Sequence, residues 1–161
     1  MVDPFEFARD GRRFDRSLAV AAFSRLAGEV ARQAGSLRVV LQGEQGRDGK
    51  FYLLVSVEGS LWLRCQRCLE PMEWPCSLSA RWLLVPKGQL IPDEELEEEA
   101  FDAVEVESRQ DLIALVEDEI LLGLPVSPRH DVCAAPSPVA GESRESPFAG
   151  LASLRGAKGS V

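Results

Sequence analysis

The chain has 161 residues, 45% of them hydrophobic and 27% charged, which fits one compact domain with tails and excludes wholesale disorder. Its formal net charge of −8 argues against broad, sequence-independent binding to a phosphate backbone, which needs clustered lysine and arginine. No apolar run approaches the roughly 18 residues that cross a membrane, and the N-terminus lacks a secretory signal pattern, so we expect a cytoplasmic protein without a membrane partner.

The first part of the chain predicts one helix. Residues 1–16 have mixed charge and predict no regular element. Ser17 can cap a helix that ends at Gly35, because a serine often precedes the first turn and a glycine often follows the last. The apolar residues near helical spacing are Leu18, Ala22, Leu26, Val30 and Ala34.

From residue 37 the apolar residues alternate, which is typical of β-strands. Two alternating runs, 37–41 and 51–57, flank a glycine-rich link and predict a hairpin. The alternation continues over 61–63 and resumes over 76–84, and a short strand near 104–106 would close the sheet. The cysteines between the third and fourth runs are therefore expected at a turn.

The second predicted helix begins after Asp111, which can cap it, and ends at Leu124, because a residue before proline avoids the α region. Its apolar stripe is broad, which implies deep packing against the sheet. The consecutive acids 117–119 point in three directions, so we expect a solvated edge and not a metal-binding carboxylate cluster. Prolines and serines dominate after this helix, and only a local constraint such as a bound metal ion would order that segment.

These elements predict an α+β fold: a single domain over residues 1–133, with an antiparallel, barrel-like sheet of four to five strands and two packed helices. Residues 134–161 are expected to form a mobile C-terminal tail with a short amphipathic motif at 147–155. Phe148, Leu151 and Leu154 lie three apart there, and Arg155 follows. The motif either docks on a partner or folds back on its own domain as a helical turn.

Cys65 and Cys68 form a CxxC pair, and His130 and Cys133 repeat its spacing later in the chain. Cysteines of a cytoplasmic chain are expected to be reduced, and three thiolates with one imidazole can hold one structural zinc ion. Cys76 could replace His130, although it alternates with core residues. The pair could also exchange thiols, although a strand precedes it and not a helix N-terminus, or the thiols could be unpaired.

Arg64 and Arg67 flank these thiols, with Trp62 and Trp74 close in sequence. Arginine beside exposed aromatic rings can hold unpaired RNA bases by charge and stacking, but the tryptophans could equally belong to the sheet core. No phosphate loop and no nucleophile–base arrangement is recognised, so we assign no catalytic residues and expect no enzymatic activity.

Three segments together resemble one known family: LRCQRC at 63–68, DLIALVEDEILLGLPVSPRH at 111–130 and SPFAGLASLR at 146–155. They resemble the YceD family, the large ribosomal RNA subunit accumulation proteins. The resemblance implies a non-enzymatic role in synthesis, processing or stability of the 23S rRNA, supporting large ribosomal subunit biogenesis. It places the family's thiols at Cys65 and Cys68, and its second Cys/His cluster at His130 and Cys133.

The partner implied is large-subunit rRNA, or a basic ribosomal or assembly protein attracted by the acidic run at 93–99. The candidate contacts are Arg64, Arg67, Phe148, Leu151, Leu154 and Arg155. The alternative function is a zinc-stabilised adaptor between proteins that does not touch RNA, which the net charge favours.

Overall fold

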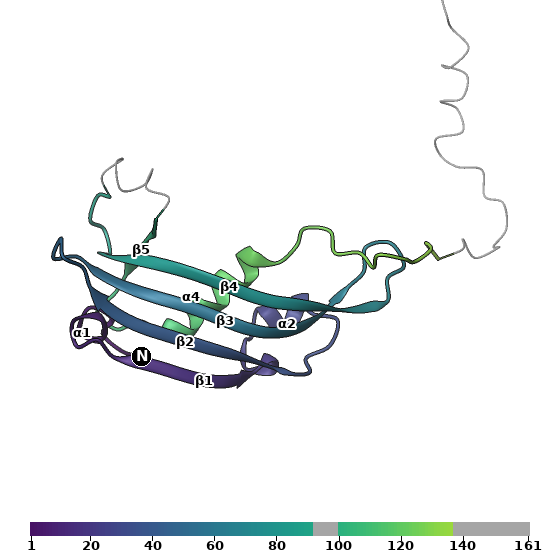
Figure 1. Ribbon diagram of the computed structural model, residues 1–161, viewed down its shortest axis with the longest axis horizontal. Helices are drawn as coiled ribbons and strands as arrows, with labels where there is room; N and C mark the ends of the chain where they lie inside the picture. Colours follow the sequence, from purple (N-terminus) through teal and green to yellow (C-terminus); the bar gives the residue numbers. More distant parts are fainter. Residues whose placement is uncertain (92–99, 137–161) are drawn as a thin grey trace, which may run out of the picture.

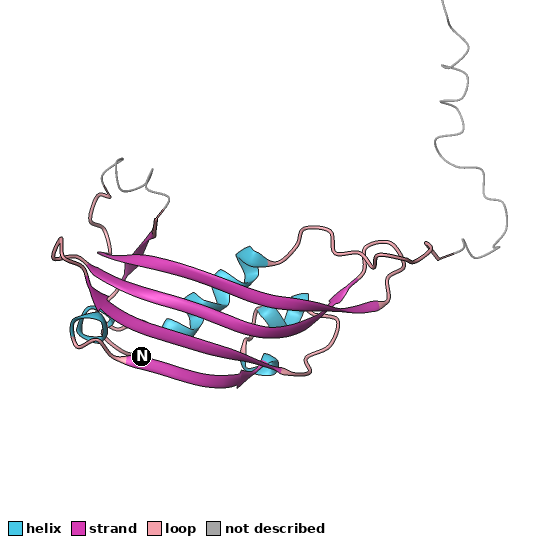
Figure 2. Ribbon diagram, viewed as in Figure 1, coloured by secondary structure: helices cyan, strands magenta, loops and turns pink. Residues whose placement is uncertain are grey.

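The computed structural model describes residues 1–91 and 100–136, and its centre is one five-stranded sheet in the order β1-β2-β3-β4-β5 (Figures 1 and 2). The strands are β1 (Arg13–Ala19), β2 (Ser36–Gln45), β3 (Phe51–Arg64), β4 (Pro71–Pro86) and β5 (Asp102–Val106). The helices are α1 (Pro4–Arg9), the 3-10 turn η1 (Val20–Ala22), α2 (Leu26–Glu29) and α4 (Leu112–Gly123).

The predicted α+β class is confirmed, but the predicted antiparallel barrel is wrong. β1 to β4 pair antiparallel, whereas β5 pairs parallel to β4, so the sheet is mixed. β1 and β5 lie at opposite edges and the sheet stays open (Figure 1). Its apolar face is covered by helices, which bury the core without sheet closure.

The central hairpin is longer than the sequence pattern predicted. β3 and β4 pair without interruption from Tyr52 with Leu83 to Arg64 with Pro71, so the runs at 51–57 and 61–63 belong to one strand. The turn that joins the two strands holds the cysteine pair at one end of the sheet, as expected.

The predicted helix over 17–35 is wrong, and so is the irregular opening. Asp3 caps α1, because its side chain accepts hydrogen bonds from the backbone N–H groups of Phe5 and Glu6. β1 then pairs with β2, and Phe14 and Leu18 pack against the core. Of the range predicted as one helix, residues 17–19 belong to β1, 20–22 to η1 and 26–29 to α2.

Gly43 in β2 allows α1 to lie close against the sheet. A Cβ atom at this position would lie 2.3 Å from the backbone oxygen of Phe7, which no real side chain could tolerate. The Gly43 N–H also donates a 2.8 Å hydrogen bond to the oxygen of Arg12, the residue just before β1.

α4 confirms the second predicted helix. Asp111 caps it by accepting from the N–H of Ile113, and the helix ends before Pro125. Val116 and Ile120 are fully buried against the sheet. In the described part of the chain, no helix is long and apolar enough to cross a membrane.

The expectation that Glu117 belongs to a solvated edge is wrong. Glu117 is 5% exposed and accepts hydrogen bonds from the N–H groups of Arg25 and Leu26, at 2.6 and 3.0 Å. The Arg25 guanidinium pairs with it at 3.1 Å and also contacts the exposed Asp118. These donors compensate the cost of burying a carboxylate, and they fasten α2 to α4.

Candidate metal centre

The turn between β3 and β4 forms a thiol-bearing knuckle over residues 65–70. The N–H of Cys65 donates to the oxygen of Glu70 at 3.0 Å, and the N–H of Leu69 donates to the oxygen of Cys65 at 2.9 Å. Leu69 adopts a left-handed backbone conformation, with φ of 68°, which reverses the chain tightly. The N–H of Arg67 donates to the Cys65 sulfur at 3.4 Å, so the turn's own backbone orients the thiol.

The segment after α4 lies alongside this knuckle. The N–H of Gln66 donates to the oxygen of Pro128 at 2.8 Å, and the Arg67 guanidinium donates to the oxygen of Cys133 at 3.1 Å. These two bonds bring His130 and Cys133 to the cysteine pair, although more than sixty residues separate them in sequence.

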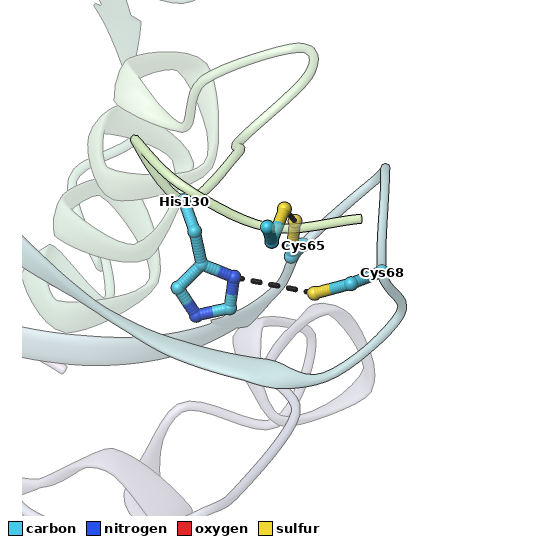
Figure 3. A group of neighbouring side chains, drawn as sticks. Cys65, Cys68 and His130 are labelled. Atoms are coloured by element: carbon cyan, nitrogen blue, oxygen red, sulfur yellow. Dashed lines mark hydrogen bonds between the residues drawn. The ribbon is translucent and has the colours of Figure 1, made fainter. Parts of the chain in front are cut away.

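The four predicted ligands converge on one point. The ligand atoms of Cys65, Cys68, His130 and Cys133 all lie within 4.8 Å of one another. The sulfurs of Cys65 and Cys133 are 3.7 Å apart, and the Cys68 sulfur is 3.3 Å from Nδ1 of His130. Figure 3 shows the labelled side chains turned toward one shared space.

These distances fit a tetrahedral zinc site. Zinc–sulfur bonds near 2.3 Å and zinc–nitrogen bonds near 2.0 Å place two sulfurs about 3.8 Å apart, and a sulfur and a nitrogen about 3.5 Å apart. Three thiolates and one imidazole are also a donor set that zinc prefers. The four residues can therefore hold a metal ion, with every position of the tetrahedron supplied by the protein.

The thiols differ in their electrostatic environment. Burial opposes the charged form of Cys65, but backbone N–H groups that donate to its sulfur outweigh burial and lower its pKa to about 5. Burial and the neighbouring thiols raise the pKa of Cys133. Cys65 is thus preorganised as a thiolate, whereas Cys133 would need the charge of a metal ion to become one.

Cys76 lies outside this cluster. It is a fully buried residue of β4, and burial raises the pKa of its thiol to about 11. The alternative in which Cys76 replaces His130 as fourth ligand therefore receives no support from the geometry, and its interpretation as a core residue is confirmed.

The two predicted arginine contacts take different positions. Arg64 is exposed, and its guanidinium donates to the oxygen of Leu69 at 3.3 Å. Arg67 is partly buried and holds the Cys133 carbonyl, so it supports the knuckle. The Arg32 guanidinium lies over the ring of Trp62, 4.8 Å from the ring centre. This cation–π contact occupies one face of the Trp62 ring.

The other predicted contacts lie outside the described residues. These are the tail positions Phe148, Leu151, Leu154 and Arg155, together with the acidic run at 93–99. The sequence pattern predicted all four residues of the candidate metal cluster but not the clamp formed by Gln66 and Arg67 on the segment after α4. The Gln66 bond of this clamp goes to the backbone carbonyl of Pro128, and a backbone acceptor leaves no signal in the sequence.

Comparison with known proteins found one family. The family model described as "Large ribosomal RNA subunit accumulation protein YceD" matches residues 53–155. No curated protein and no solved structure gave a significant match. The matched region covers more than half of the chain, and it includes β4, β5, α4 and all four candidate metal ligands. The chain therefore belongs to the YceD family.

Proposed function

We propose that this protein is a non-enzymatic factor in the synthesis, processing or stability of 23S rRNA, which supports accumulation of the large ribosomal subunit. The observation that carries the proposal is the family match over residues 53–155. The family is named for accumulation of large-subunit rRNA, and the chain's own resemblance in three separate segments agrees with it.

The metal centre has a structural role in this proposal. Four ligands from the protein leave no open coordination position for substrate or water, which is typical of a structural and not a catalytic zinc site. The ion would hold the segment after α4 against the sheet end and so keep the surface around Arg64 in one shape. We propose this surface, with Leu69 and Val132 exposed beside it, as the place of rRNA contact.

The second candidate is a zinc-stabilised adaptor that reaches rRNA only through another protein. The net charge of −8 favours it, because an acidic protein gains little from a phosphate backbone. Its partner would be a basic ribosomal or assembly protein.

Depletion of the protein in cells tests the proposed function. The ratio of large-subunit to small-subunit rRNA should fall on depletion and recover with wild type or the core variant Cys76→Ser, but not with the ligand variant Cys68→Ser. An unchanged ratio after complete depletion would refute the ribosomal role.

Crosslinking in the same cells separates the two candidates. Ultraviolet crosslinks to large-subunit rRNA that weaken in Arg64→Ala would support direct contact. Recovery of ribosomal or assembly proteins that survives RNase treatment, without any RNA crosslink, would support the adaptor.

A further inference from the structure

β5 offers an unpaired strand edge. It is the last strand of the sheet, and the N–H of Lys87 donates to the oxygen of Val106, so the backbone groups of Val106 face β4. Because these groups alternate sides along a strand, those of Ala103 and Glu105 face outward. Within the described residues, no strand pairs with this edge.

A groove lies beside the same strand, between β5 and α4. Its volume is about 340 Å³. Its apolar lining comes from Trp82, Val104, Leu115 and Leu122. Leu122 is 84% exposed, although leucine usually packs inward. Leu115 and Leu122 are seven residues apart on α4, so this is a second apolar stripe, distinct from the one that Val116 and Ile120 bury.

Carboxylates surround the groove. Asp102, Asp118 and Glu119 contribute to its lining. Glu119 accepts from the indole N–H of Trp82 at 3.3 Å, and Asp118 contacts Arg25 at the far rim. Glu105 is exposed on the opposite face of β5, because it alternates with Val104. Arg25 offsets one of the three groove carboxylates, and Lys87 lies near Glu105 and Glu107, so both sides of the strand edge have a net negative charge.

We propose that a basic, extended segment of a partner protein binds here by adding a strand to β5. Outward backbone groups supply hydrogen bonds, the groove receives the apolar side chain of every second residue, and the lysines or arginines between them point to the opposite face, toward Glu105. An open edge, an apolar groove and an acidic rim together select this occupant, because an acidic segment would not match the rim and a helical segment would not pair with the edge. The inference does not depend on the ribosomal role.

The test uses the full chain, loaded with zinc, and a labelled nonapeptide of alternating valine and lysine. The peptide should bind and slow hydrogen exchange at the amides of Ala103 and Glu105, measured by NMR. A peptide with glutamate in place of lysine should not bind, and a peptide N-methylated on the face that pairs with β5 should lose the protection.

Three exposed positions provide the protein variants. Glu105→Lys should weaken binding by about tenfold at low salt, because it places a cation where the peptide carries its own, and Leu122→Lys should weaken binding because it places a charge in the groove that receives valine. Glu58→Lys makes the same charge change on β3, which β4 separates from β5, and should leave affinity within about twofold.

Three results would overturn the proposal. One is binding that Glu105→Lys and Leu122→Lys leave unchanged, and another is peptide binding without protection at β5. The third is protection of these amides in the free protein: if it grows with protein concentration it assigns the edge to a second copy, and if it does not, the chain itself covers the edge.

Discussion

Replacing Glu117 by alanine tests how the N-terminal part of the chain is held to α4. The buried carboxylate accepts from the N–H groups of Arg25 and Leu26, and it pairs with the Arg25 guanidinium. Alanine leaves these donors without an acceptor. Each buried donor left unpaired costs about 1–3 kcal/mol, and relief of carboxylate burial offsets part of the sum, so we expect the free energy of unfolding to fall by about 2–4 kcal/mol.

The matched control is Asp118→Ala. Asp118 contacts the same arginine, but half of its side chain is exposed, so water replaces the lost contact and the effect should be small. Urea unfolding of the zinc-loaded protein measures both variants. With a urea slope of about 1–3 kcal/mol per molar, Glu117→Ala should shift the midpoint by about 1–2 M, and Asp118→Ala should shift it far less.

The pH dependence supplies a second readout. Burial raises the pKa of Glu117, but the N–H donors of Leu26 and Arg25 and the guanidinium outweigh burial and hold the pKa below its usual value. The folded protein therefore binds this proton less readily than the unfolded chain. The stabilisation is fully present at neutral pH and declines as the pH falls below the unfolded value of about 4.3 toward the folded pKa.

The stability difference between the two variants should thus narrow in acid. Comparing Glu117→Ala with Asp118→Ala at each pH cancels the loss of metal that acid causes in both. Equal midpoints for the two variants at pH 7, or a difference that widens below pH 4, would refute the assignment of Glu117 as the buried anchor.

Three further predictions concern other parts of the molecule. Elemental analysis should find about one zinc ion per chain in wild type and in Cys76→Ser but none in Cys133→Ser, and metal-free wild type prepared without chelators would contradict the site. Gly43→Ala should lower the free energy of unfolding in urea by about 1–3 kcal/mol, because its Cβ would meet the α1 backbone. The control Gly28→Ala, where nothing lies within 4 Å, should be neutral or slightly stabilising. Equal unfolding midpoints for the two variants would argue against the close approach of α1 to Gly43. Arg67→Ala should speed hydrogen exchange in the segment after α4 without removing the metal, and unchanged exchange would show that the metal alone orders that segment.

The sequence predicted the four residues of the candidate metal cluster because their signal is local: two short Cys/His pairs with the same spacing can be recognised without knowledge of the fold. The helix that begins after Asp111 could be predicted for the same reason, because a capping residue before it and a proline after it mark its two ends. The N-terminal helix failed because the predicted range is divided among β1, η1 and α2, and the pairing of residues 17–19 with β2 is a non-local contact that the apolar spacing does not report.

Other features depend on contacts distant in sequence. Whether a sheet closes is set by how its edge strands meet, and no local pattern reports that β5 runs parallel to β4. Glu117 was misassigned for the same reason: its donors lie 91 and 92 residues away, so its burial could not be read from the helix that carries it.

A metal ion bound by both Cys65 and Cys133 would give the chain a topology that disulfides give to secreted proteins. A bound ion would close a ring that spans 68 positions and contains β4, β5 and α4. Such a crosslink restricts the unfolded chain more than the folded one, and by the loop-closure relation a ring of this size is worth several kcal/mol, about 4. A protease that cut the chain once inside the ring would leave two fragments still tied through the metal, and only chelation together with denaturant would release them.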